Sequence, residues 1–192
     1  MNNLCRGWML WLLLGWPAAL GAHELQANRA TLVLRDRQHV QLSLYVDLIP
    51  ALAQALAPEQ PASEFLLAAA AMPPEAFADW YHDGVLRLQK DTVVKDADGQ
   101  RLTVTHWQWP AAEDLRQSLQ TWTMEALVAP TAHHHAIISE VRAEASAGRV
   151  MSGLSLRLPT AFGDVLVVWY QPQQQVLQAG TEGQLRFTDP AR

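Results

Sequence analysis

The chain has 192 residues, of which 49% are hydrophobic and 17% are charged, and its formal net charge is −5. This length is sufficient for one domain with a hydrophobic core. A mildly acidic chain with scattered charges argues against a nucleic-acid-binding protein and against binding to anionic membrane surfaces.

The first 22 residues have the pattern of a secretory signal. Arg6 gives a weakly positive start, residues 8–16 are apolar, and Leu20-Gly21-Ala22 is a suitable cleavage site. The apolar part is shorter than the ~20 residues that span a bilayer. An uncleaved anchor is the alternative, which the helix-breaking Pro17 disfavours. We therefore expect a periplasmic or, alternatively, extracellular protein, not itself transmembrane after processing, with one β-rich domain at residues 23–192.

The single cysteine, Cys5, lies inside this signal. The processed chain would therefore have no disulfide, no thiol nucleophile and no thiolate metal ligand.

Residues 25–34 and 40–48 predict a hairpin across the turn Asp36-Arg37-Gln38. In its second strand, apolar residues alternate with polar ones, which indicates one buried face. The apolar set is Val40, Leu42, Leu44 and Val46.

Residues 50–90 predict a helical insertion. Residues 51–71 are rich in Ala and Leu, which favours short helices between prolines. Pro73-Pro74 then opens a longer helix, and its apolar residues fall on one stripe. That stripe is Phe77, Trp80, Tyr81, Gly84, Val85 and Leu88.

The rest of the chain predicts mostly strands. We expect a hairpin over the turn at residues 96–99, a helix at 111–119, a strand at 122–128, a hairpin joining 137–145 to 149–158, and short end strands at 176–177 and 185–187. The run Val165-Leu166-Val167-Val168-Trp169-Tyr170 predicts a strand buried on both faces. The expected fold class is α+β, mainly an antiparallel β-sandwich with a helical insertion at about residues 50–90.

Sequence signatures of catalysis are missing. No Gly-x-Ser-x-Gly elbow, His-Glu-x-x-His pair, phosphate-binding loop or dinucleotide fingerprint occurs in the chain. We therefore expect a protein that is not an enzyme, with no catalytic or organic cofactor-binding residues.

Histidines offer the candidate metal ligands. His133-His134-His135 is the densest cluster, and in a strand His133 and His135 would share a face. Cleavage after Ala22 would give His23 a free amine beside its imidazole, and His106 could add a ligand. Such nitrogen ligands suit copper or nickel. A solvated connection is the alternative interpretation of the triplet.

Trp107 and Trp109 predict an aromatic pair on one strand face. If that face were open, the two rings could stack on a carbohydrate or bind a partner. If the helical insertion covers it, they belong to the core.

Four parts of the chain resemble the exported N-terminal domains of some HupE/UreJ-type membrane proteins and related small periplasmic proteins. They are Ala22-His23-Glu24-Leu25, Val46-Asp47-Leu48, Asp98-Gly99 and Leu156-Arg157-Leu158-Pro159-x-x-Phe162-Gly163-x-Val165-Leu166-Val167. The family is linked to transport of nickel or related metals. The resemblance implies an accessory periplasmic domain and carries over no catalytic residue.

Together these features predict a non-catalytic periplasmic accessory or binding protein. Its expected partner is a membrane protein or another envelope component, in transition-metal handling. A copper- or nickel-binding protein that uses His23 and the His133–His135 cluster is one alternative, and a carbohydrate-binding or carbohydrate-cleaving sandwich is another.

Overall fold

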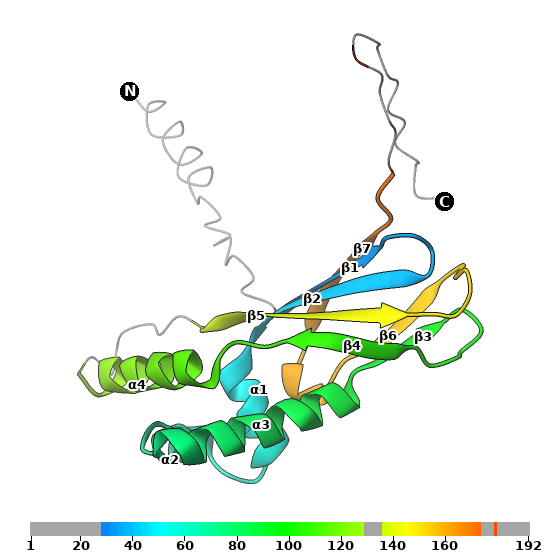
Figure 1. Ribbon diagram of the computed structural model, residues 1–192. Coiled ribbons are helices and arrows are strands. Elements are labelled where there is room, and N and C mark those ends of the chain that lie inside the picture. The colour runs from blue at the N-terminus through cyan, green and yellow to red at the C-terminus, as the bar shows by residue number, and fades with distance from the viewer. Residues whose placement is uncertain (1–27, 129–135, 174–178, 180–192) are drawn as a thin grey trace, which may run out of the picture.

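The computed structural model describes residues 28–128, 136–173 and 179 (Figure 1). Its strands are β1 (Asn28–Leu34), β2 (His39–Asp47), β3 (Val93–Asp96), β4 (Thr103–Gln108), β5 (Ile138–Ser146), β6 (Leu154–Arg157) and β7 (Val165–Tyr170). Its helices are α1 (Leu48–Leu56), α2 (Ala62–Ala70), α3 (Pro74–Asp91), α4 (Ala112–Val128) and the 3-10 turn η1 (Thr160–Phe162).

The predicted N-terminal hairpin is confirmed and lies at the centre of the fold. β1 and β2 pair antiparallel, with Leu32 opposite Leu42 and Ala30 opposite Leu44. Val40, Leu42, Leu44 and Val46 are all buried, whereas the residues between them are partly exposed. The two-residue alternation of the sequence therefore does mark a sheet with one face in the core.

Five strands form the main sheet, in the order β4-β5-β2-β1-β7. All neighbours are antiparallel except β1 and β7, which are parallel. β3 and β6 form a separate two-stranded sheet. The α+β class is thereby confirmed, and helices α1 to α3 fill the predicted insertion at residues 50–90.

The predicted hairpin between residues 137–145 and 149–158 is wrong. β5 pairs with β2 and β4 in the main sheet, whereas β6 pairs with β3 in the small sheet. Alternating residues indicate a strand but not its partner, and the connection at residues 147–153 is long enough to change sheets.

The predicted strand at residues 122–128 is also wrong, because helix α4 continues through it to Val128. Leu115 and Leu119 are buried one turn apart, and Trp122 packs partly against the same core. No Pro or Gly interrupts residues 112–128, so a helix that has started can continue. At its first turn, Arg116 forms a two-pronged ion pair with Glu113 at 2.8 and 2.9 Å.

β7 is not buried on both faces as the sequence predicts. It is an edge strand of the main sheet, and Trp169 is 77% exposed. An apolar run of this length occurs in edge strands as well as in central strands, so its composition does not give the position of the strand in the sheet.

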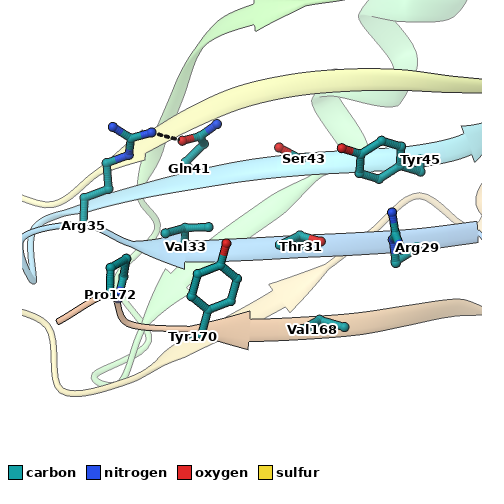
Figure 2. A pocket seen from close by; sticks show the side chains of 10 residues that line it. All are labelled: Arg29, Thr31, Val33, Arg35, Gln41, Ser43, Tyr45, Val168, Tyr170 and Pro172. Atoms are coloured by element: carbon teal, nitrogen blue, oxygen red, sulfur yellow. Dashed lines mark hydrogen bonds between the residues drawn. The ribbon is translucent and has the colours of Figure 1, made fainter. Parts of the chain in front are cut away.

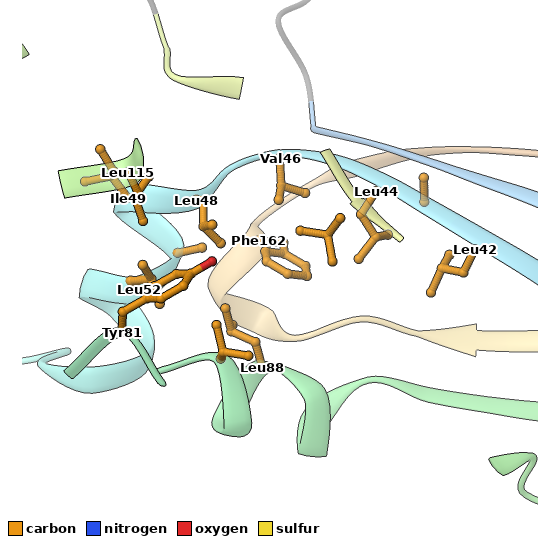
Figure 3. Packing of buried hydrophobic residues seen from close by; sticks show 14 of the residues in the cluster. Leu42, Leu44, Val46, Leu48, Ile49, Leu52, Tyr81, Leu88, Leu115 and Phe162 are labelled. Atoms are coloured by element: carbon orange, nitrogen blue, oxygen red, sulfur yellow. The ribbon is translucent and has the colours of Figure 1, made fainter. Parts of the chain in front are cut away.

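The hydrophobic core lies between the buried face of the main sheet, the helices and η1 (Figure 3). Phe162 of η1 points toward the leucines of β2 and α1, and Leu88 of α3 approaches from below. Tyr81 donates its hydroxyl to the carbonyl of Pro110 at 2.9 Å, so its polar end is satisfied although its ring is buried. No helix among the described residues has the length and apolar character needed to cross a membrane.

A buried carboxylate joins the small sheet to the β5–β6 connection. Asp96, at the end of β3, is 4% exposed and accepts the guanidinium of Arg149 at 2.7 Å. Its other oxygen accepts the amides of Asp98 and Gln100 at 3.0 and 2.8 Å, which closes the turn. The Arg149 guanidinium, followed by these amides, holds the pKa of Asp96 below its ordinary value.

Gly84 is required where helix α3 crosses α1. A Cβ at this position would lie 2.4 Å from Cδ2 of Leu52 and 3.0 Å from Cδ1 of Leu56. Leu52 is fully buried, so it has no free space into which to move.

We therefore expect Gly84→Ala to destabilise the protein by about 1 kcal/mol. Overpacking of ~1–3 kcal/mol outweighs the ~1 kcal/mol that alanine gains in helix propensity. Thermal unfolding measures the change, and Gly148→Ala is the control, since nothing lies within 4 Å of a Cβ there. A Gly84→Ala protein at least as stable as the parent would contradict the close crossing.

Asp47, where β2 meets α1, is expected to make stability depend on pH. Burial raises the pKa of its carboxyl to about 6, although the nearby amide of Ile49 partly opposes this. Because the folded pKa lies above that of the unfolded chain, ionised Asp47 destabilises the fold above pH ~6, and this penalty disappears as the pH falls toward ~4.

Asp47→Asn should then raise the free energy of unfolding by roughly 1–3 kcal/mol at pH 7.5 and have little effect at pH 4. Urea titrations at both pH values measure this difference, with exposed Asp83→Asn as the control. Equal effects of Asp47→Asn at the two pH values would show that the carboxyl titrates normally.

Candidate functional site

The face of the main sheet opposite the core is mostly polar on β1 and β2, and the side chains that these two strands present there are not buried. On β2 this open face presents Gln41, Ser43 and Tyr45, and on β1 it presents Thr31 and Val33, all of them half-buried. These residues alternate with the core residues of the same strands, so burying one set leaves the other toward solvent.

A shallow groove of about 580 Å³ runs along this face (Figure 2). We call it the arginine groove, after the two cations at its opposite ends, Arg29 and Arg35. Its lining residues are Arg29, Thr31, Val33, Arg35, Gln41, Ser43, Tyr45, Val168, Tyr170 and Pro172.

Both arginines are held by neutral side chains. The Arg29 guanidinium lies 4.6 Å from the centre of the Tyr45 ring, a cation–π contact. Arg35 donates a hydrogen bond from Nη2 to Oε1 of Gln41 (Figure 2). Among the described residues, neither arginine forms an ion pair. Both side chains are exposed, and no carboxylate among the described residues pairs with them.

The third arginine of the open face is neutralised. Arg142 on β5 donates two hydrogen bonds of 2.9 Å to the carboxylate of Glu140. Glu140 also accepts the Tyr45 hydroxyl at 2.9 Å, and this bond is the main reason that the pKa of Tyr45 is raised. Tyr45 is therefore positioned between Glu140 and Arg29. The open face also carries the exposed carboxylate of Glu144 on β5, opposite Gln41 and 3.4 Å from His106.

The spacing of Arg29 and Arg35 suits an extended ligand. Arg29 lies on β1 and Arg35 directly follows its last residue, so six steps of extended chain, or roughly 20 Å at ~3.3 Å per residue, separate them. The groove between them is lined by hydroxyls, an amide and the Tyr170 ring, and contains no carboxylate. It can thus hold two anionic groups about six strand residues apart.

Sequence reasoning missed these residues. A signal exists in the pattern Arg29-x-Thr31-x-Val33-x-Arg35, which puts two cations at the ends of one strand face. That neither cation meets a carboxylate depends on the order of the strands, which the pattern does not contain.

Of the predicted metal ligands, only His106 lies within the described residues. His23, His133 and His135 fall outside them. His106 is exposed on β4, 3.4 Å from Glu144 and 3.1 Å from the Thr105 hydroxyl, and no group of three metal-binding side chains occurs among the described residues. Copper or nickel binding stays a prediction.

His106 also determines which face of β4 the side chain of Trp107 meets. Its φ of 53° forms a bulge, since three steps from Thr105 to Gln108 on β4 match two steps from Glu144 to Arg142 on β5. The extra residue turns Trp107 to the face of Val104, instead of the face of Thr105.

Trp107 and Trp109 are consequently half-buried against the core. Their rings stack with centres 5.6 Å apart, and both pack on the hydrophobic cluster. The indole N–H of Trp109 is buried, with no hydrogen-bond partner among the described residues. The pair therefore does not lie on the open face.

A second groove, of about 600 Å³, lies on the other face of the sheet beside β7. We call it the apolar groove, because aliphatic and aromatic side chains dominate its lining. These are Leu32, Leu34, Met151, Leu154, Leu156, Val167 and Trp169.

Comparison of the chain with protein-family models, with curated proteins and with solved structures finds no match.

The bulge predicts opposite effects of two substitutions at His106. Glycine adopts positive φ without strain, whereas a β-branched residue does not. We expect His106→Gly to stabilise the protein by up to about 1 kcal/mol and His106→Val to destabilise it by about 1–2 kcal/mol. Chemical denaturation measures both. If valine and glycine had equal effects, the positive φ of this residue would be wrong.

Proposed function

We propose that this chain is an exported, non-catalytic binding module whose binding surface is the arginine groove on the open face of the sheet. The observation that carries this proposal is the pair of arginines that no carboxylate among the described residues neutralises. The chain as a whole has a net charge of −5, so two such cations six positions apart form a local positive region in an acidic protein. Exposed guanidinium groups that no described carboxylate pairs with suit an anionic partner.

The chemistry of the groove favours binding over catalysis. Its lining has hydroxyls on Thr31, Ser43, Tyr45 and Tyr170 but no histidine, carboxylate or cysteine that could act as a general base. The Tyr45 hydroxyl already donates a hydrogen bond to Glu140 at 2.9 Å.

We propose a protein of the cell envelope as the partner. The resemblance to exported domains of HupE/UreJ-type proteins favours a membrane protein in transition-metal handling. A carbohydrate ligand has less support, because Trp107 and Trp109 pack against the core. Among the described residues that line the arginine groove, Tyr45 and Tyr170 are the only aromatic ones.

A photo-crosslinking amino acid at Ser43, in the middle of the groove, tests the proposal in cells that naturally make the protein. We expect an adduct of one discrete mass from Ser43 and none from the same group at exposed Asp79 on α3. Arg29→Gln with Arg35→Gln should reduce the adduct about tenfold, a loss of ~1.4 kcal/mol in binding. Arg157→Gln, an exposed arginine of β6, is the charge control.

Equal adducts from Ser43 and Asp79, or no dependence on Arg29 and Arg35, would contradict a specific binding face. Turnover in a hydrolase screen that groove substitutions abolish would contradict the non-catalytic assignment.

A further inference from the structure

β7 forms one edge of the described sheet. Among the described residues, β1 is its only strand neighbour, so no described strand pairs with the backbone groups on its other side. Edge strands of natural proteins are commonly shielded by charges, prolines or bulges. Val165-Leu166-Val167-Val168-Trp169-Tyr170 contains no charge and no proline, and its pairing with β1 is regular.

The two faces of β7 border two different grooves. Leu166, Val168 and Tyr170 pair in register with Arg29, Thr31 and Val33, so they share the face of the arginine groove. Val167 and Trp169 pair with Ala30 and Leu32 and border the apolar groove. A single strand edge thus separates a cationic surface from an apolar one.

The apolar groove has room for side chains from outside. Trp169 borders it and is 77% exposed, although Leu32 and Met151 at its base are buried. The exposed indole of Trp169, next to buried aliphatic residues, is an apolar surface that a partner could cover.

We propose that the outer edge of β7 accepts an extended segment of the partner as an additional strand, and that this segment alternates acidic with apolar residues. Successive side chains of a strand point to opposite faces of the sheet. One set of the added strand would face the arginines and the other would enter the apolar groove. This inference rests on the proposed function and specifies how the partner binds.

Charge decides between this partner and a second copy of the chain. Two copies joined by their β7 strands would place only Leu166, Val168 and Tyr170 next to the arginine groove. Arg29 and Arg35 would still lack an anion. An acidic partner supplies one, and its apolar side chains can still cover Trp169.

The test uses a fluorescent peptide of about ten residues, the length of a long strand, in which Glu alternates with Leu. Three controls are a peptide of the same composition in which Glu and Leu are grouped, one with Lys in place of Glu, and one N-methylated at alternate backbone amides. We expect the alternating peptide to bind at least about tenfold more tightly than each control.

Substitutions separate the two faces of the site. Trp169→Ser, and Arg29→Gln with Arg35→Gln, should each weaken binding of the alternating peptide about tenfold, while Leu86→Ser, which alters a leucine of α3 that is 48% exposed, should leave it unchanged. All these positions are exposed, so circular dichroism should show folded variants.

Hydrogen exchange of the β7 amides reports on the edge itself. The β7 amides that point away from β1 are the informative ones, because the alternate amides already pair with β1. We expect these outward amides to exchange fast in the free protein and slowly with the peptide bound. Slow exchange in the free protein at every concentration would mean that the chain's own residues cover the edge, and slow exchange that grows with concentration would mean a second copy. Either result overturns the proposal.

Equal binding of all four peptides, or none, would also overturn strand addition. If the Ser43 adduct nevertheless persisted, the groove would still bind a partner by another mode. If the adduct failed as well, the binding module itself would be wrong.

Discussion

The burial of one face of β2 is the constraint on which the rest of the structure depends. This strand lies between β1 and β5, and Leu42, Leu44 and Val46 put the centre of the sheet into the core. Helices α1 and α3 and the turn η1 all pack toward this layer (Figure 3). Because side chains alternate along a strand, the same burial directs Gln41, Ser43 and Tyr45 to the opposite face. The core and the open face are thus two consequences of one pattern.

Charge on the open face follows from how the strands are ordered. β5 brings Glu140 and Arg142 together, so those two charges satisfy each other and Tyr45. β7, on the other side of β1, brings no charge at all. Arg29 and Arg35 therefore meet an aromatic ring and an amide in place of a carboxylate.

The sequence predicts much of the fold but little of the candidate site. The β1–β2 hairpin follows from strict alternation beside a turn, and the stripe from Phe77 to Leu88 predicts α3 correctly, because both patterns are local. Pairing of β6 with β3 depends on contacts distant in the chain, which no local pattern encodes.

The remaining errors also have physical causes. At residues 122–128, alternation by two competes with helical spacing, and packing of Leu115 and Leu119 decides for the helix. The one-residue bulge at His106 moves the side chain of Trp107 to the opposite face of β4. For β7 the apolar composition is read correctly as a strand, but its position at the edge depends on the whole sheet. That no described carboxylate pairs with Arg29 or Arg35 depends on strand order in the same way.

The parallel pairing of β1 with β7 has a consequence for biogenesis. The first and the last described strands lie side by side, so residues 28–33 can pair with residues 165–170 only after the latter have been synthesised. Synthesis proceeds from the N-terminus, so β1 is made before β7 and stays at the edge of the sheet until β7 pairs with it. Their pairing closes a long loop, which carries an entropic cost. A factor that shields β1 during that interval would protect the unfinished polypeptide from misassembly.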